Sequence, residues 1–439
     1  MKELEILKDP NPKLRVEAEA VNSFNGAIQE LIDNMIYTMR KSDGIGMAAP
    51  QVNESKKIII AEYETPEKTK DNFPLFVIVN PKIVECSKEK EFMVEGCLSF
   101  PGKELYIKRP KESEVEGFDR WGKPIKVKTS DLFCRVLLHE IDHLNGVLMI
   151  DHIKSVKTVF IGNGSLGFPI LERITDDPQF DLQAVLTSIN RPSGRKNLNC
   201  ESLVAEEANK LKLKLYKIDK IRDSKTIKLI KEINPELIIL ADFGQILSKE
   251  LVQLPKYGVL NIHPSLLPKY RGPSPIVSAL LAGEKRTGVS IIKLDENIDS
   301  GNILSQIEIR ISSRETAVNL KKKLAGLAAE LLAETVPYYL AGEITPIVQD
   351  QTKATESKII TKENGKLVGN ESSQKVDRMV RALYPWPGVY IGINKRKFFI
   401  TKVHLNKEKK LIIDRVKPEG KKEMSYTDFT LGNSERLTF

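Results

Sequence analysis

Two histidines one helical turn apart, with a glutamate between them, form the most reactive pattern in the chain. They lie in His139-Glu140-Ile141-Asp142-His143, within a predicted helix that begins near Ser130-Asp131 and ends at Asn145-Gly146. Residues i and i+4 share one helix face, so both imidazoles can bind one metal ion. Glu140 can then take a proton from metal-bound water. The alternative is a solvated helix that carries this pattern by chance.

A third metal ligand is expected from the segment upstream of this helix. Two blocks precede it, Glu95-Gly96-Cys97-Leu98-Ser99 and Gly44-Ile45-Gly46-Met47-Ala48-Ala49-Pro50-Gln51. The three blocks in this order resemble the peptide deformylases, and the resemblance spans about residues 1–153. It implies that Cys97 joins His139 and His143 as a metal ligand. Met47 stands where the family usually has leucine, a change that conserves volume.

The resemblance also implies how this site would remove a formyl group. One thiolate and two imidazoles leave a fourth tetrahedral position for water, and the metal would acidify that water and polarise the formyl oxygen. Gln51, Gly46 and the Leu98 backbone N–H would complete the catalytic site, and Glu140 would pass a proton to the departing amine. The expected substrates are nascent formylmethionyl peptides at the ribosome.

The ligand set alone suits zinc, whereas the family commonly uses Fe²⁺ and also accepts Zn²⁺, Ni²⁺ or Co²⁺. The remaining cysteines, Cys86, Cys134 and Cys200, are predicted to pack in the core rather than to bind metal, and His152 is predicted to be structural. Four cysteines in a long chain without a secretory signal do not indicate a disulfide framework.

A second group of polar residues follows two predicted strands in the middle of the chain. Asn261 and His263 are two apart on an extended stretch, so they point the same way. Asp299 lies in the loop after the predicted strand Val289–Leu294. Such strand ends are where α/β sheets place active sites. Asn261 can donate to a developing oxyanion, His263 can accept or relay an amine proton, and Asp299 can orient the histidine. The alternative is a turn with an incidental histidine.

The block from Asn261 to Gly272, followed by Asp299-Ser300-Gly301, resembles the formyltransferases that use 10-formyltetrahydrofolate. Those enzymes have an asparagine, a histidine and an aspartate at the matching positions. The resemblance implies 10-formyltetrahydrofolate as the formyl donor. It places folate near the Asp295–Asp299 loop and against a set of candidate binding residues: Asp242, Gly244, Ile246, Ser265, Leu266, Leu267 and Pro268.

The formyl acceptor must be inferred from the C-terminal region. The blocks Arg378–Pro387 and Gly420–Ser425 resemble the methionyl-tRNA formyltransferases, and this resemblance runs from about Thr158 to the C-terminus. It implies initiator methionyl-tRNA as partner. It also implies a small C-terminal OB-like β-barrel that holds the tRNA. The segment 190–196 matches that family's basic loop but is shorter. The candidate tRNA contacts are Arg191, Arg195, Lys196 and Arg271.

The charge distribution agrees with a polyanionic partner. The chain has a net charge of +9, and residues 353–439 carry 19 Lys and Arg against 10 Asp and Glu, which equals the whole excess. A merely solvated basic face is the plain alternative. Other acceptors stay open because sugar-nucleotide and glycinamide-ribotide formyltransferases share the Asn261, His263 and Asp299 pattern. A non-catalytic scaffold that binds tRNA or the ribosome is a further alternative.

One motif points elsewhere. Gly162-Asn163-Gly164-Ser165-Leu166-Gly167 satisfies the dinucleotide-binding pattern GxGxxG after a strand, but the acidic residue expected after the next strand is absent. We therefore expect these glycines to form the tight first turn of the formyltransferase sheet instead.

The elements that must position these residues suggest a multidomain chain of 439 residues. We predict an α+β deformylase domain at 1–154, a Rossmann-like α/β catalytic domain at 155–350 and the OB-like module at 351–439. A long helix is predicted over Ala317–Val336, ended by Pro337, and 349–370 is predicted to be a linker. No apolar run approaches the roughly 18 residues of a membrane span, and the charged N-terminus has no signal pattern, so a cytoplasmic location is expected.

Overall fold

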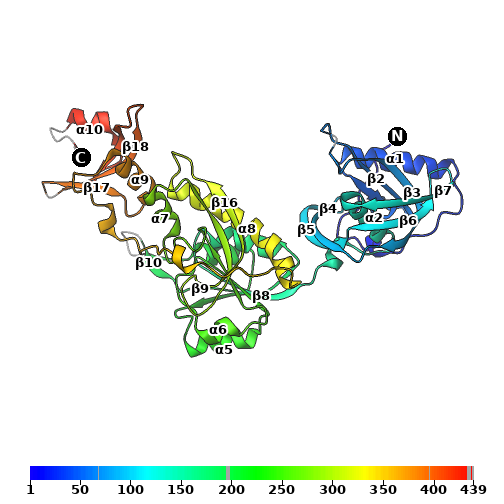
Figure 1. Ribbon diagram of the computed structural model, residues 1–439, viewed down its shortest axis with the longest axis horizontal. Coiled ribbons are helices and arrows are strands. Elements are labelled where there is room, and N and C mark those ends of the chain that lie inside the picture. The colour runs from blue at the N-terminus through cyan, green and yellow to red at the C-terminus, as the bar shows by residue number, and fades with distance from the viewer. Residues whose placement is uncertain (68, 194–197, 395, 433–436, 438–439) are drawn as a thin grey trace. The chain divides into compact units, whose positions relative to one another are not determined.

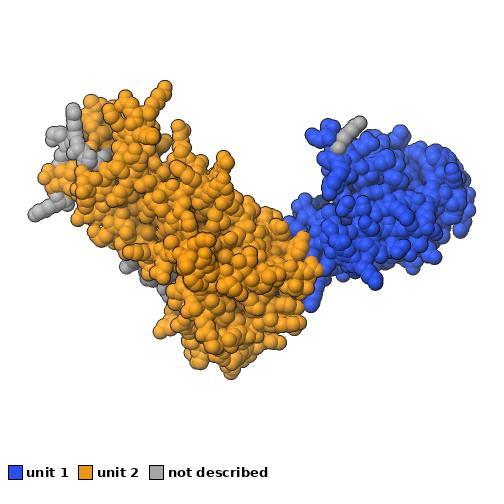
Figure 2. Space-filling model, viewed as in Figure 1, with its two compact units in different colours: residues 1–155, 177–179 blue, residues 156–176, 180–439 orange. Residues whose placement is uncertain are grey.

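The structure is a computed structural model that describes residues 1–67, 69–193, 198–394, 396–432 and 437. The chain divides into two compact units, Met1–Ser155 with Asp177–Gln179, and Val156–Asp176 with Phe180–Phe439 (Figures 1 and 2). Each unit is described by itself below. The boundary that we predict near residue 350 falls inside the second unit and stays a prediction.

The first unit combines a five-stranded antiparallel sheet, a separate two-stranded sheet and two helices. The strand order of the larger sheet is β1-β2-β3-β6-β7, and β4 pairs only with β5. The elements are α1 (Gly26–Lys41), β1 (Gly46–Ala48), β2 (Ile58–Tyr63), β3 (Phe73–Cys86), β4 (Lys90–Cys97), β5 (Phe100–Pro110), β6 (Glu112–Phe118), β7 (Pro124–Ser130) and α2 (Asp131–Leu144).

Strand β2 shows why this unit needs a helix on each face of its sheet. Its side chains alternate, so Ile58 and Ile60 pack in the cluster that contains α1, whereas Ile59 packs in the cluster that contains α2. All three isoleucines are fully buried. The sheet therefore holds α2 in a fixed position, and the predicted bounds of this helix are confirmed.

The second unit is built on a seven-stranded, mostly parallel sheet in the order β12-β9-β8-β13-β14-β15-β16, in agreement with the predicted Rossmann-like α/β domain. Only β15 and β16 run antiparallel to their neighbours. The strands are β8 (Val156–Gly162), β9 (Phe180–Ser188), β12 (Leu215–Ile218), β13 (Leu237–Ala241), β14 (Val259–His263), β15 (Arg286–Lys293) and β16 (Asn302–Arg310).

Helices cover both faces of this sheet. Phe160 of β8 packs in the cluster that contains α3 and α8, while its neighbours Val159 and Ile161 pack in the cluster that contains α5 and α6. Helices α5 and α6 lie together on one side in Figure 1. The helices are α3 (Gly167–Asp176), α4 (Leu203–Lys210), α5 (Ser224–Ile233), α6 (Lys249–Gln253), α7 (Pro275–Ala282) and α8 (Ala317–Leu340); the short strands β10 (Arg191–Ser193) and β11 (Leu198–Cys200) pair with each other.

Helix α8 corrects one prediction. It does not end before Pro337 but continues for one more turn to Leu340, with the proline inside the helix. Proline is tolerated in the first turn of a helix but not readily in the last, because it has no backbone N–H to donate, so tertiary contacts must favour the extra turn here. The Tyr339 hydroxyl donates to the backbone carbonyl of Tyr257 at 2.6 Å, and the Leu340 side chain packs against the main core.

The C-terminal region forms an open sheet. Its strands follow one another as β17-β18-β19-β20, and β17 and β20 do not pair in the part of the chain that the structure describes. The predicted closed OB-like barrel is therefore not confirmed. The elements are α9 (Ser373–Leu383), β17 (Val389–Ile393), β18 (Arg396–Leu405), β19 (Leu411–Pro418), β20 (Met424–Ser425) and α10 (Tyr426–Gly432). No helix among the described residues has the length and apolar content that crossing a membrane requires.

Candidate functional sites

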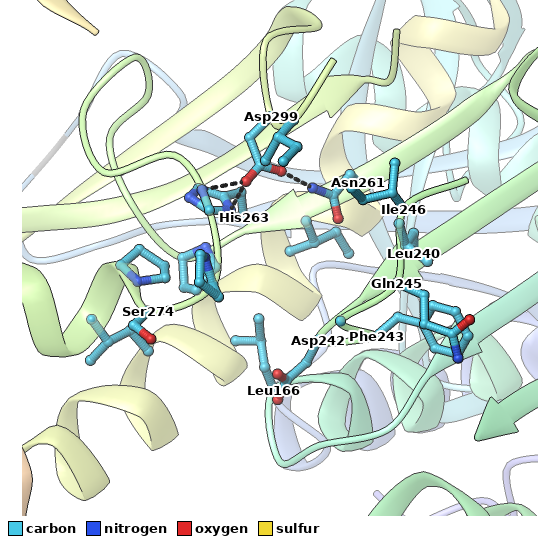
Figure 3. A pocket seen from close by; sticks show the side chains of 18 of the residues that line it. Leu166, Leu240, Asp242, Phe243, Gln245, Ile246, Asn261, His263, Ser274 and Asp299 are labelled. Carbon is cyan, nitrogen blue, oxygen red and sulfur yellow. Dashed lines mark hydrogen bonds and ion pairs between the residues drawn. The ribbon is translucent and has the colours of Figure 1, made fainter. Parts of the chain in front are cut away.

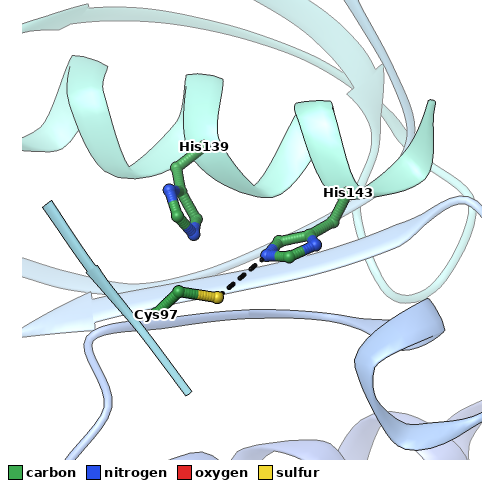
Figure 4. Close-up of side chains that lie close together, drawn as sticks. All are labelled: Cys97, His139 and His143. Carbon is green, nitrogen blue, oxygen red and sulfur yellow. Dashed lines mark hydrogen bonds between the residues drawn. The ribbon is translucent and has the colours of Figure 1, made fainter. Parts of the chain in front are cut away.

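Cys97, His139 and His143 converge on one point in the first unit (Figure 4). Cys97 ends strand β4, and both histidines project from α2 toward it. Their ligand atoms all lie within 4.8 Å of one another. The Cys97 Sγ and His143 Nε2 atoms are 3.2 Å apart, near the roughly 3.5 Å expected between two ligands of one tetrahedral ion. The sequence-predicted ligands therefore form a candidate metal centre.

A buried carboxylate orients the first of these histidines. The Nδ1 atom of His139 lies 3.0 Å from Glu95 Oε2, which leaves Nε2 for the metal position. Burial alone would raise the pKa of Glu95, but hydrogen bonds from His139 and Arg109 outweigh it and hold that pKa well below its usual value. The sequence alone points to no role for Glu95, although it precedes Cys97 by only two residues.

Two arginines complete the network around Glu95. Arg109 donates to both carboxylate oxygens, at 2.6 and 3.0 Å, and Arg135 donates to one of them at 2.6 Å. Arg109 also reaches Asp142 at 2.7 Å, and Asp142 in turn lies 2.7 Å from His152 Nε2. His152 therefore has the structural role that we predict, at the outer end of this chain of contacts.

Glu140 lies beside the metal position in a dry environment. Burial raises the pKa of its carboxyl group to about 7, and its buried Oε2 has no hydrogen-bond partner among the described residues. A Cβ atom on Gly46 would come within 2.4 Å of Glu140 Oε1 and 2.8 Å of Val136 Cγ1, so a side chain there would displace the Glu140 carboxylate. A buried carboxyl group with a pKa close to 7 can accept and return a proton at neutral pH.

Gln51 and Leu98 lie next to Cys97. The Gln51 side chain accepts from the Ala48 backbone N–H at 2.8 Å, and its Nε2 lies 3.5 Å from Cys97 Sγ. Leu98 follows Cys97 directly, and its carbonyl accepts from Lys8 Nζ. The structure therefore brings all the predicted residues of this site together.

The other cysteines correct a prediction. Cys134 is buried as expected, but Cys86 and Cys200 are exposed rather than part of the core. Cys86 ends β3, whose last five residues are all exposed, and Cys200 ends β11 in a two-stranded sheet.

Asn261, His263 and Asp299 meet in the second unit (Figure 3). Asn261 and His263 lie on β14, and Asp299 lies in the loop between β15 and β16. Asn261 Nδ2 donates to Asp299 Oδ1 at 3.0 Å, and His263 Nδ1 lies 3.4 Å from Asp299 Oδ2. The Gly272 backbone N–H donates to the same Oδ2 at 2.7 Å. Asp299 has a φ of +48°, a conformation that a non-glycine residue adopts only when its surroundings enforce it.

A backbone carbonyl orients the ring of His263. Its Nε2 lies 2.9 Å from the carbonyl oxygen of Tyr270, so this nitrogen carries the hydrogen of that bond. The other nitrogen, Nδ1, faces Asp299. The histidine and the aspartate therefore form one unit that can share a proton.

These residues line a cavity of about 520 Å³, a size typical of small-molecule sites. Three of the predicted folate residues line it, Asp242, Gly244 and Ile246, as does the Asp295–Asp299 loop except for Glu296. Asp242 forms an ion pair of 2.8 Å with Lys321, which also lines the cavity and which our sequence analysis did not single out.

The other four predicted folate residues, Ser265, Leu266, Leu267 and Pro268, are not among the lining residues of this cavity. They form a turn held from within. The fully buried Ser265 donates through its hydroxyl to the Lys269 carbonyl at 2.7 Å, and the Leu267 N–H donates to Ser290 Oγ at 3.1 Å. The structure thus gives these residues a supporting position behind His263.

The glycine turn after β8 is filled by the protein itself. A Cβ atom on Gly164 would lie 2.0 Å from Asp242 Oδ2, so a carboxylate occupies the place where a dinucleotide phosphate would need positive potential. Asn163 closes the turn by donating to the Phe243 carbonyl at 2.8 Å. This geometry supports a structural turn, as we predict.

The structure describes only some of the predicted tRNA contacts. Arg195 and Lys196 lie outside the described residues, and Arg191 is placed only as part of β10. Arg271 is placed fully, and its guanidinium donates to the Gln349 and Gln351 side chains at 2.7–3.1 Å. The structure therefore places Arg271 inside a hydrogen-bond network of the second unit.

Comparisons with known protein families agree with the division of the chain into two compact units. The polypeptide deformylase family matches residues 3–159, the formyl transferase family matches 156–336, and the formyl transferase C-terminal domain matches 359–412. The methionyl-tRNA formyltransferase of Enterococcus faecalis is 35% identical over 305 residues, which cover 64% of this chain and 97% of that protein. That of Caldicellulosiruptor saccharolyticus is 39% identical over 233 residues, 53% of this chain and 74% of that protein. A crystal structure of a peptide deformylase from Legionella pneumophila is 36% identical and covers 35% of this chain and 86% of that one, with a TM-score of 0.32.

The network around Glu95 leads to a stability prediction. We expect Glu95→Gln to destabilise the first unit by about 3–5 kcal/mol, because it removes the carboxylate that pairs with the buried Arg135 and leaves the buried Arg109 with Asp142 alone. The matched control is Glu62→Gln, which disrupts a similar bidentate ion pair with Arg40. The Arg40 side chain is 57% exposed. We expect this control to cost no more than about 1 kcal/mol.

The measurement is labelling of the buried Cys134 thiol in increasing urea, with the labelled site identified by mass spectrometry. Equal shifts of the labelling midpoint for both variants would contradict the prediction.

Proposed function

The chain belongs to the methionyl-tRNA formyltransferase family and carries a polypeptide deformylase domain ahead of it, and we propose how its residues run the two reactions. One reaction removes the formyl group from N-terminal formylmethionine. The other transfers a formyl group from 10-formyltetrahydrofolate to the amino group of methionyl-initiator tRNA. The observation that carries the proposal is that each half of the chain holds a complete constellation for its own reaction.

The residues of the first site fit a divalent ion. Glu95 fixes the orientation of His139 through Nδ1, and the Nε2 atom of His143 lies 3.2 Å from the Cys97 sulfur, so three donor atoms face one position. We propose Fe²⁺ as the metal, with Zn²⁺, Ni²⁺ or Co²⁺ able to replace it. When bound, the ion supplies a Lewis acid that polarises the formyl oxygen and acidifies a water molecule.

The chain's own residues then complete deformylation. Glu140 takes a proton from the attacking water and gives it to the amine as the carbon–nitrogen bond breaks, which releases formate and a free N-terminus. The Gln51 amide and the Leu98 backbone N–H stabilise the negative charge on the formyl oxygen. Gly46 leaves the space that Glu140 needs. We propose nascent formylmethionyl peptides at the ribosome as the substrates.

Formyl transfer takes place at the cavity of the second unit. The methionine amine attacks the formyl carbon, negative charge develops on its oxygen, and the bond to the folate nitrogen then breaks. Asn261 donates one amide hydrogen to Asp299 and can donate the second to the formyl oxygen. The pair of His263 and Asp299 takes up the proton that the amine releases and returns it to the folate nitrogen as the bond to the formyl carbon breaks. Asp242, Gly244 and Ile246 line the space proposed for the folate.

We propose that the tRNA is held by a C-terminal domain at 351–439, next to a catalytic domain at 155–350. The support is the basic excess of that region, which fits phosphate contacts and predicts binding that weakens with salt. Arg191, Arg195 and Lys196 stay proposed contacts of the short basic loop. For Arg271 the hydrogen bonds to Gln349 and Gln351 favour a supporting role.

We expect Cys97→Ala to lose most of the bound metal and most of the deformylase activity, because two imidazoles alone hold an ion weakly. Metal content per chain, measured by elemental mass spectrometry, and release of formate from a formyl-methionyl peptide are the readouts. The matched control is Cys86→Ala, which removes an exposed thiol and should retain both. Equal metal in the two variants would mean that the occupied site lies elsewhere.

The formyl transfer assay tests the second half of the proposal. The purified chain should transfer formyl from 10-formyltetrahydrofolate to methionyl-tRNA, and His263→Ala should lower this rate by about 10²-fold or more. Deformylation by the same preparation should not change, so it serves as an internal control of enzyme concentration. A wild-type chain that deformylates peptides but does not formylate methionyl-tRNA would count against the proposed acceptor.

A further inference from the structure

Gln349 connects a segment outside the matched family domains to the formyl transfer site. It lies in the region between residues 336 and 359, which neither formyl transferase match covers and which our sequence analysis treats in part as a linker. Its side chain is nevertheless buried, with only 3% of the residue exposed. A buried amide that is not part of a regular element needs partners for all its polar atoms.

The Gln349 amide makes four hydrogen bonds. Its Nε2 donates to the backbone carbonyls of Asp299 and Gly301, at 2.8 and 2.7 Å. Its Oε1 accepts from Arg271, from Nε at 3.1 Å and from the terminal nitrogen Nη2 at 2.7 Å. Its two hydrogens and both lone pairs of its oxygen are thereby used.

The partners of the Gln349 nitrogen and those of its oxygen both help to fix the Asp299 carboxylate. Asp299 has the strained φ of +48°, and Gln349 holds its backbone by the carbonyl. Arg271 directly precedes Gly272, whose N–H donates to Asp299 Oδ2 at 2.7 Å. One buried amide therefore fixes the aspartate's own backbone and also the neighbouring loop that holds its oxygen.

The rest of the segment follows the same loop. Residues 347–357, here called the strap, pair with β16 through Ile347 and Ile303 and then run beside the loop after His263. Ser357 N–H donates to the Arg271 carbonyl at 2.6 Å, and Tyr270 N–H donates to Thr355 Oγ1 at 2.8 Å. Tyr270 supplies the carbonyl that orients His263. The strap thus contacts both the segment that carries Asp299 and the loop that orients His263.

We propose that Gln349 is a positioning residue for formyl transfer, acting through Asp299 and, by way of the strap, through the loop that holds His263. The proposal rests on the function proposed above for this site. Gln349 itself is not among the lining residues of the cavity, so its effect is on the geometry of the reacting groups rather than on substrate contacts.

The test is steady-state formyl transfer by Gln349→Leu, which keeps the side chain's bulk and removes all four hydrogen bonds. We expect kcat to fall about 10- to 100-fold, as displacement of a catalytic group by an ångström does, while KM for methionyl-tRNA and for the folate changes by no more than about 2-fold. The matched control is Gln351→Leu, which removes one bond from Arg271 and one to the Gln349 backbone carbonyl but none to Asp299 or Gly301, and whose kcat should stay within about 2-fold of wild type.

A double-mutant cycle separates an effect on the position of Asp299 from a general loss of folded structure. If Gln349 acts through Asp299, Gln349→Leu should cause little further loss in an Asp299→Asn background. Gln349→Glu is a second, nearly isosteric variant for the case that the leucine variant does not fold. Its carboxylate would face the Asp299 and Gly301 carbonyls, so its kcat should recover toward low pH, where a protonated carboxyl group can donate again.

The proposal is overturned if Gln349→Leu keeps the wild-type kcat, if its effect is confined to KM, or if its loss in the Asp299→Asn background equals its loss in wild type. These outcomes presuppose a wild-type chain that formylates methionyl-tRNA. An inactive wild type would contradict the proposed function instead, so the two failures can be told apart.

Discussion

Each site depends on a carboxylate that is largely shielded from water, with 4% of the Glu95 side chain and 13% of the Asp299 side chain exposed, and the chain must therefore supply it with hydrogen-bond donors. Such a charge is costly unless several donors surround it. Glu95 meets this condition with His139, Arg109 and Arg135, and Asp299 meets it with Asn261 and the Gly272 N–H. The donors come from different strands, helices and loops, so satisfying the charge also fixes the geometry of the reacting groups.

This requirement explains why residues without direct contact to substrate matter in both halves. Arg109 connects Glu95 to Asp142 and, through it, to His152 beyond the metal-binding helix. Gln349 plays the corresponding part at the other site by bonding the backbone of Asp299 and the side chain of Arg271. In both cases the hydrogen bonds around one carboxylate hold the reacting side chains in a fixed arrangement.

The sequence predicted what depends on local spacing. The helix that carries His139 and His143 and the strand that carries Asn261 and His263 have their predicted positions, because short motifs and periodicity determine both. Three-dimensional packing determined the rest. Ser265–Pro268 follow the motif in sequence but support it from behind, and Gln349 lies in a polar stretch whose burial no local pattern reveals. The extra turn of α8 beyond Pro337 likewise depends on contacts with Tyr257 and the core.

The central claim is that one polypeptide holds two chemically independent sites for the formyl group, only one of which needs a metal ion. The direct measurement is to strip the purified chain of metal with a chelator and to assay both reactions in the same sample. The account predicts that deformylation of a formyl-methionyl peptide is lost and returns with Fe²⁺ or Zn²⁺, while formyl transfer to methionyl-tRNA persists throughout. Loss of both activities on chelation, or of neither, would contradict it.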